Sequence, residues 1–421
     1  MKRILLFSLI LSFFATAEAQ FVEVSYDVNY TQQVYYNLTT DAKTPIKNNE
    51  WDIAISTNQR DVAIHLNEAA GTQEQALELY FSPTVDFADV IDPATLTLQL
   101  YNPDISWSAG AFNSIAQPGN PFDFGWGTYD PATFTVNGTA IFGYKKRDGS
   151  WKKLMIESLA GATFTIKMAD LDGANEQVYT FDMTAYTDRR MVFYSFETEK
   201  VVDISTDFDL VFSRYYSPAS DGTGTILDYS VSGVLSGFGV EVAQANDVAP
   251  STVEFAPFQD SLTTDINAIG FDWKEINLTT FAWNIDPHRA YFIKKANNDV
   301  WKFVFIDFEG SSTGNLVFEK TLMGNIGASN LEDATSAFSG FNVFPNPVQT
   351  EATIAFSLKN SGNINLTLTS VLGQQVWNHR SQATEGFNVV TMPDLNIARG
   401  TYFLNLQADN GEVISKKISV Q

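Results

Sequence analysis

The chain has 421 residues, which is long enough for two or three domains, and its formal net charge is −23. It contains no cysteine, so disulfide bonds, zinc–thiolate sites, iron–sulfur clusters and cysteine nucleophiles are excluded. The negative charge argues against nucleic acid and anionic lipid as partners, and the 33 Phe and 16 Tyr favour strands over helices.

Residues 1–19 have the pattern of a signal peptide. Lys2 and Arg3 precede an apolar run that ends at Phe14, and Ala17-Glu18-Ala19 forms an A-x-A cleavage site. The apolar run is too short for a permanent membrane anchor. We expect cleavage after Ala19. We also expect no transmembrane segment in the mature chain, because no later stretch is long and apolar enough.

A strand–turn–strand pattern occurs twice in the body of the chain. Val34–Thr40 is followed, after a polar turn, by Glu50–Ile55, and Met191–Thr198 is followed by Thr206–Phe212. Each copy contains a strand, a turn and then a strand with the order aromatic, Asp, aliphatic.

A hairpin pattern also occurs twice. Phe142–Leu154 and Phe292–Phe303 each contain two lysines, a polar turn, a Trp-Lys pair and an apolar strand. A short Trp element precedes each hairpin, at Phe124–Gly127 and at Phe271–Lys274. Because these markers recur in one order, they predict the duplication of a domain of ~150 residues. Chance similarity among hairpins of an all-β chain is the alternative.

The duplication predicts two antiparallel β domains, at residues 20–185 and 186–326. We expect the two halves to superpose, with Trp151 and Trp301 in equivalent places and with helix confined to short turns. Residues 327–340 are predicted to be a linker to the C-terminal region.

Residues 341–421 have the pattern of a small β-sandwich. Ala352–Leu358 and Ile364–Leu368 alternate between apolar and polar residues, as half-buried strands do. Glycines fall between the strands, where turns need positive φ: Gly373, Gly386 and Gly400. The region from Phe341 onward is neutral, so the excess negative charge lies in the body.

Aromatic residues crowd the segment Trp107–Tyr129 among Pro and Gly. An aromatic-lined loop can stack on a sugar ring or on a porphyrin face, and a small core beneath a long loop is the alternative. The sequence contains no His-Glu-x-x-His or phosphate-loop motif. We therefore expect a binding protein and no enzyme.

The C-terminal region resembles the type A C-terminal sorting domain of the type IX (Por) secretion system of Bacteroidetes. The resemblance rests on Pro345-Asn346-Pro347, Leu372–Val376, Gly386–Asn388, Arg399–Tyr402 and Lys416–Val420. It implies a small Ig-like sandwich and the type IX machinery as a partner. It also implies export across the outer membrane, usually with removal of this domain, so that the mature protein is secreted or lies at the outer-membrane surface.

The body resembles the HmuY family, all-β surface or secreted proteins of Bacteroidetes whose founding type binds haem. The resemblance rests on Tyr35–Leu38, Trp51–Ala54, Trp273-Lys274, Tyr291–Lys295 and Trp301–Phe305. It implies two HmuY-like antiparallel β domains and haem, or a haemoprotein, as a partner. A surface adhesin or carbohydrate-binding protein without haem is the alternative.

Haem iron needs axial donors such as His, Met or Tyr. His288 is the candidate cofactor-binding residue because it lies in the better-matching copy, beside Arg289, whose cation could pair with a propionate. His65 lies in a predicted strand, and His379 belongs to the sorting region. For His65 and His288 a surface or hydrogen-bonded histidine is the alternative. Methionines that could serve as donors, although they ordinarily fill cores, are Met155, Met168, Met183, Met191 and Met323.

Overall fold

The computed structural model describes residues 19–58, 62–220, 223–326, 337–371 and 373–420. Within these residues the regular structure consists of β-strands and short 3-10 helices, so the predicted all-β class is confirmed. The helices are η1 (Val28–Tyr30), η2 (Pro93–Thr95), η3 (Ala111–Asn113), η4 (Met183–Tyr186), η5 (Ala256–Ser261) and η6 (Gly310–Ser312). Apart from Ala19, the predicted signal peptide lies outside the described residues, as does most of the predicted linker.

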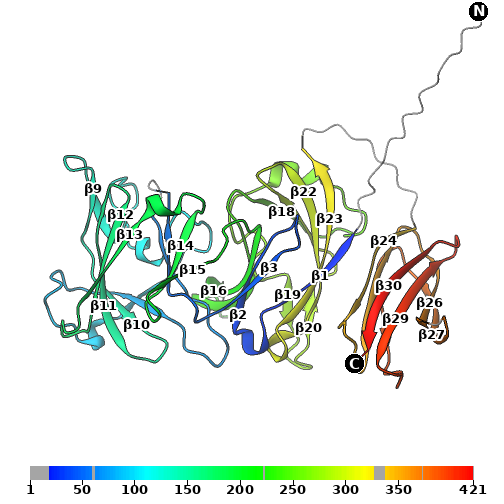
Figure 1. Cartoon of the computed structure of the whole chain (residues 1–421). Helices are drawn as coiled ribbons and strands as arrows, with labels where there is room; N and C mark the ends of the chain where they lie inside the picture. Colours follow the sequence, from blue (N-terminus) through cyan, green and yellow to red (C-terminus); the bar gives the residue numbers. More distant parts are fainter. Residues whose placement is uncertain (1–18, 59–61, 221–222, 327–336, 372, 421) are drawn as a thin grey trace, which may run out of the picture.

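The described strands form six larger sheets, which we number from left to right in Figure 1. Sheet 1 contains β6 (Glu78–Phe81), β7 (Leu98–Leu100), β8 (Gly127–Asp130), β9 (Thr135–Gly138), β10 (Phe142–Lys145), β11 (Trp151–Ala160), β12 (Thr163–Ala169) and β13 (Gln177–Asp182). Sheet 2 contains β4 (Ile53–Ser56), β5 (Ile64–Leu66), β14 (Met191–Ser195) and β15 (Lys200–Val202). Sheet 3 contains β2 (Gln32–Tyr36), β3 (Lys43–Lys47), β16 (Leu210–Ser220) and β17 (Ile226–Ser236).

Sheet 4 contains β1 (Gln20–Ser25), β18 (Glu241–Ala245), β21 (Ala290–Lys294), β22 (Asp299–Phe308) and β23 (Asn315–Asn325). A separate hairpin is formed by β19 (Lys274–Ile276) and β20 (Trp283–Ile285). Sheet 5 contains β24 (Phe338–Phe344), β25 (Ala352–Leu358) and β28 (Gly386–Met392). Sheet 6 contains β26 (Gly362–Ser370), β27 (Gln375–Ala383), β29 (Gly400–Ala408) and β30 (Val413–Val420).

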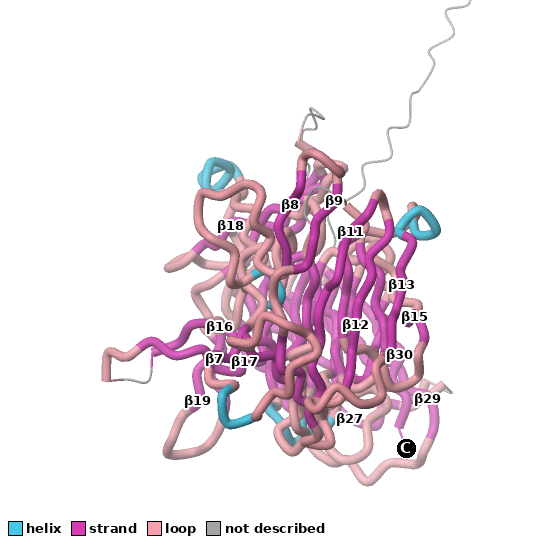
Figure 2. Tube along the Cα trace, turned by 90° about the vertical axis from the view of Figure 1, so that its left-hand side faces the viewer, coloured by secondary structure: helices cyan, strands magenta, loops and turns pink. Residues whose placement is uncertain are grey.

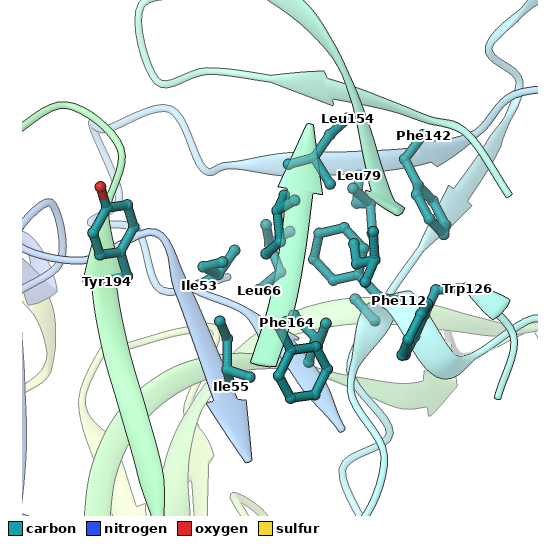
Figure 3. Close-up of a cluster of buried hydrophobic side chains, with 14 of the residues drawn as sticks. Ile53, Ile55, Leu66, Leu79, Phe112, Trp126, Phe142, Leu154, Phe164 and Tyr194 are labelled. Atoms are coloured by element: carbon teal, nitrogen blue, oxygen red, sulfur yellow. The ribbon is translucent and has the colours of Figure 1, made fainter. Parts of the chain in front are cut away.

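The first four sheets are stacked, and the central strands β4 of sheet 2 and β2 of sheet 3 are buried on both faces. Successive side chains of a strand point to opposite faces, so Ile53 and Ile55 of β4 join the core with sheet 1 (Figure 3), whereas Ala54 joins the core with sheet 3. In β2, Tyr36 faces sheet 4 and Tyr35 faces sheet 2. This double burial explains the apolar runs Val34–Tyr36 in β2 and Ile53–Ile55 in β4.

Strands from the two sequence halves share sheets. β4 pairs with β14 through Ile53 and Tyr194, and β2 pairs with β16 through Tyr36 and Leu210. In addition, the N-terminal strand β1 pairs with β23. The boundary predicted between residues 185 and 186 therefore does not coincide with a division between sheets. The superposition of two duplicated halves stays a prediction.

Trp151 and Trp301 are not equivalent, contrary to the prediction. The residue that pairs across the strand end next to the turn is Trp151 in the first hairpin but Val300 in the second. Trp301 therefore comes one position later, and a shift of one residue turns a side chain to the other face of the sheet. Trp301 packs in the core between sheets 3 and 4, whereas Trp151 packs on the outer face of sheet 1 against Tyr80.

The C-terminal region packs against the body. Sheets 5 and 6 enclose their own core, as the predicted sandwich requires. Phe344 and Ala355 of sheet 5 contact Val317 of sheet 4, and the rings of Phe21 and Phe387 lie 6.2 Å apart. The C-terminal sandwich therefore covers part of the outer face of sheet 4.

Candidate functional site

An aromatic groove lies beside the β8–β9 hairpin of sheet 1, which faces the viewer in Figure 2. Its volume is about 380 Å³. The lining residues are Val62, Pro121, Phe122, Phe124, Tyr129, Phe134, Val136, Leu159 and Gly161. The side chains among them are apolar except for the hydroxyl of Tyr129. Three of the four aromatic lining residues, Phe122, Phe124 and Tyr129, belong to the aromatic segment Trp107–Tyr129 that the sequence analysis singled out.

Two buried polar side chains fix the loop that forms the groove. The Asn113 amide oxygen accepts hydrogen bonds from the N–H groups of Ile64 and Gly110, each at 3.0 Å. Its amide nitrogen donates to the carbonyl groups of Val62 (3.2 Å) and Phe124 (3.0 Å). The indole of the buried Trp126 also donates to the Val62 carbonyl, at 3.2 Å. The wall is thus tied to the core of the sheet.

Two aromatic side chains at the groove remain exposed. Phe122 is 49% exposed and stacks on Tyr129, with ring centroids 6.0 Å apart and planes at 12°. Phe134 is 75% exposed and has a φ of 57°, which is uncommon for a bulky residue. Its turn is held by Asp130, whose carbonyl accepts the Phe134 N–H at 2.9 Å. Exposed rings in a fixed backbone are typical of contact sites.

The β19–β20 hairpin repeats this turn with a different residue at one position of the groove lining. The spacing from Trp273 to Phe281 equals that from Trp126 to Phe134, and Phe281 is likewise 75% exposed with a φ of 57°. The position of Val136, however, is taken by Trp283. This larger ring packs 5.2 Å from that of Phe308. The repeated hairpin therefore presents the same exposed ring, but with a larger side chain at the position that lines the groove in the first hairpin.

A second, smaller cavity of about 70 Å³ lies between sheets 2 and 3 and is lined in part by His65 and Trp107. His65 is buried, and its Nε2–H donates to the Trp107 carbonyl at 3.1 Å. Burial lowers the pKa of His65 to about 4, so the ring is neutral at physiological pH. Sites for drug-sized ligands occupy roughly 300–1,000 Å³, so this cavity is too small for a porphyrin.

His288, the predicted haem ligand, lies on an exposed turn. Its main-chain N–H donates to Asp286 Oδ1 at 2.9 Å. Arg289 pairs with Asp272 at 2.9 Å and with Asp286 at 3.3 Å, so two carboxylates already hold the cation that was assigned to a propionate. The cavities described above are lined by other residues. The structure thus places His288 apart from these two cavities, and its role as a haem ligand stays a prediction.

The remaining candidates do not assemble a metal site. His379 is half-buried in the C-terminal sandwich and stacks on Trp377. In the part of the chain that the structure describes, no group of three or more His, Asp or Glu residues is arranged to hold a metal ion. The sequence reasoning missed Phe134 and Val62. The repeated turns Asp130–Phe134 and Asn277–Phe281 are the pattern that would have indicated Phe134.

Comparison with known proteins identifies the C-terminal region. Residues 342–421 match the family described as the secretion system C-terminal sorting domain. No curated protein matches the chain. One similar solved structure is dimeric latent PorU from Porphyromonas gingivalis, with 12% sequence identity and a TM-score of 0.22 over 68% of this chain. The chain spans only 31% of that protein.

The family match confirms the prediction for the C-terminal region to within one residue. Such a domain implies export by the type IX secretion system and a secreted or cell-surface location. Over the residues that the structure describes, helices long and apolar enough to cross a membrane are absent. The resemblance of the body to the HmuY family stays a prediction. Residues 342–421 are a type IX sorting domain.

Proposed function

We propose that this chain is a non-enzymatic surface binding protein of the adhesin kind, which holds an apolar or aromatic group of its ligand in the groove. The observation that carries this proposal is the exposure of Phe122 and Phe134 beside a 380 Å³ apolar cavity. Covering such rings is favourable by about 25 cal/mol per Å² of apolar surface removed from water.

The composition of the lining supports an apolar group over a sugar. A sugar ring stacks on aromatic side chains, but its hydroxyl groups also need hydrogen-bond partners when they leave water. Among the lining side chains only Tyr129 offers a hydroxyl. A protein side chain or another apolar group therefore fits this lining better.

Haem is the second candidate, supported by the HmuY resemblance and by one feature of the groove. Tyrosine is an axial iron donor in some haem proteins, and the Tyr129 phenol belongs to the apolar lining. His288 lies elsewhere, so the described residues do not place it opposite this phenol as a second donor. The fit is therefore incomplete, and the proposed role of His288 remains to be tested separately.

The proposal can be tested with Nile red, a neutral dye whose fluorescence rises in apolar sites. We expect saturable binding by the chain from Gln20 onward, and at least about tenfold weaker binding by the double variant Phe122→Ser, Phe134→Ser. Phe281→Ser is the matched control, because it removes an equally exposed ring from the same kind of turn and does not line the groove.

The comparison between these variants decides the location of the site. Unchanged affinity of Phe281→Ser, together with the loss in the double variant, would support the groove. Equal losses in both would show that the dye reports exposed rings in general, and full binding by the double variant would overturn the proposal. Thermal unfolding of each variant checks that it is folded.

A further inference from the structure

Strands β16 and β17 form a ribbon that projects from the body, on the left in Figure 2. They pair without interruption from Leu210 and Ser236 to Ser220 and Ile226. The neighbouring strand β2 pairs only with residues 210–212 of β16. The outer part of the ribbon therefore consists of two strands, although such a pair is only marginally stable by itself in water.

The two edges of the ribbon differ. The N–H and carbonyl groups of Val234 bond to Gly270, so they point away from β16. In an antiparallel pair this direction alternates along the strand, and the unbroken register gives Asp228 and Ile226 the same outward direction. On the other strand, Pro218 lies directly opposite Asp228 and has no N–H to offer. One edge is blocked by proline, and the other is open.

The open edge is short and apolar. The outward carbonyl groups of Ser232 and Ser230 already accept hydrogen bonds, from Lys274 Nζ at 2.5 Å and from Arg214 Nη2 at 3.3 Å. The open part therefore lies beyond them, at Asp228 and Ile226. Ile226 is 62% exposed, Leu227 55% and Tyr229 66%. Natural edge strands are usually protected by lysine, proline or a bulge, and β17 has none of these.

We propose that the outer edge of β17 binds an extended, basic peptide segment of a partner protein as an added strand. Main-chain hydrogen bonds to Ile226 and Asp228 would supply the pairing, and apolar side chains of the peptide would cover Leu227 and Tyr229. Asp228 is the only charged residue of β17, and a cationic side chain opposite it is favourable.

Charge selects this occupant over a second copy of the chain. Two copies would each carry a formal charge of −23 and would repel one another. A self-paired edge would also bring the two Asp228 carboxylates near each other, which is destabilising. A basic peptide segment, in contrast, is attracted by the negative charge of the chain and by the Asp228 carboxylate.

The test uses a labelled peptide of about six residues, the length of an average strand, in which valine and lysine alternate. Fluorescence anisotropy with the full chain from Gln20 onward should show saturable binding of this peptide, and the binding should weaken as the salt concentration rises. Asp228→Pro should weaken it by at least about tenfold, because proline removes the outward N–H and leaves the bonds to β16. Pro218→Ala, on the opposite edge, should retain the wild-type affinity.

Three results would overturn the proposal. These are absence of binding by the wild type, unchanged binding by Asp228→Pro, and equal binding of a peptide with glutamate in place of lysine. The remaining alternative is that a second copy of the chain binds at this edge, and sedimentation tests it. A wild type that is dimeric and an Asp228→Pro variant that is monomeric would make a second copy the occupant. Thermal unfolding confirms that both variants keep the fold.

Discussion

Asp52 and Asp209 make equivalent hydrogen bonds between the two sequence halves. Asp52, in the first half, accepts an N–H group of the second half, and Asp209, in the second half, accepts an N–H group of the first. Asp52 Oδ2 accepts the main-chain N–H of Phe196 at 2.6 Å, and Asp209 Oδ2 accepts that of Leu38 at 2.7 Å. Each aspartate follows an aromatic residue at the start of its strand and binds the turn that follows the paired strand of the other half. The recurring aromatic-Asp-aliphatic pattern therefore joins the halves.

Replacing either aspartate should destabilise the body. Both side chains are buried, and Asp52→Ala would leave the Phe196 N–H without its acceptor. An unsatisfied buried group costs roughly 1–3 kcal/mol, so we expect the free energy of unfolding to fall by about this amount. Asp209→Ala should cost at least as much, because Asp209 also pairs with Lys295 at 2.9 Å. Urea unfolding measures both, and losses below about 0.5 kcal/mol would contradict the structural role.

Local patterns predicted the strands but not their partners. Alternation and turn residues identify a strand such as β4 from its own sequence, whereas its pairing with β14 depends on long-range contacts that leave no local trace. The error at Trp151 has a different cause. Both turns take the same number of residues, since Lys145 pairs with Trp151 and Lys294 with Val300, but Trp301 comes one residue later in the sequence and so turns to the other face.

The groove was predictable only in part. The crowding of aromatic residues indicated Phe122, Phe124 and Tyr129, but Trp107 of the same segment lies instead at the inner cavity with His65. Phe134 is far from the conformation that its bulk favours, so propensity gives no reason to expect it at a turn.

Glu68 should make stability fall as pH rises from 4.5 to about 8. Burial is the main cause that raises its pKa from 4.5 to about 8, so the folded state holds a proton that the unfolded state has lost between these values. Stability from this group is complete below pH 4.5 and is lost as pH rises to about 8, at up to about 1.4 kcal/mol per unit.

His65 acts in the opposite direction at lower pH. Burial lowers its pKa from 6.5 to about 4, so the folded state binds fewer protons in that window and stability rises with pH. The effects of Glu68 and His65 on the pH dependence of stability offset each other from pH 4.5 to about 6.5. Above pH 6.5 only the loss of stability from Glu68 remains. Because His65 is present in both proteins, Glu68→Gln should gain stability relative to the wild type over the whole range from pH 4.5 to about 8. A difference that does not change with pH, in urea unfolding at several pH values, would refute this account.

Haemin titration distinguishes the two ligand candidates. Because His288 is exposed and Arg289 is already paired with two aspartates, we expect His288→Ala to give the same Soret band as the wild type. Tyr129→Phe should weaken any band that arises from the groove. Loss of a low-spin spectrum in His288→Ala would instead establish that residue as a ligand. No binding of micromolar haemin by the wild type would leave the adhesin account.

Processing at both ends should be visible in the exported protein. The A-x-A site predicts that the mature chain begins at Gln20, and the sorting domain at residues 342–421 directs export. We expect the surface or released form to lack residues 1–19 and most of the chain after Gly340. Removal of the C-terminal sandwich would uncover Phe21 and Val317, which the sandwich contacts.

Mass spectrometry of the protein from its native host measures both ends directly. A variant that lacks residues 342–421 should stay in the periplasm, because the machinery then has no domain to bind, whereas Phe281→Ser should be exported normally as a folded control. Recovery of an intact carboxyl terminus from the medium would contradict removal of the domain. Export of the truncated variant would contradict the role of the sorting domain itself, since the remaining chain would then carry its own route across the outer membrane.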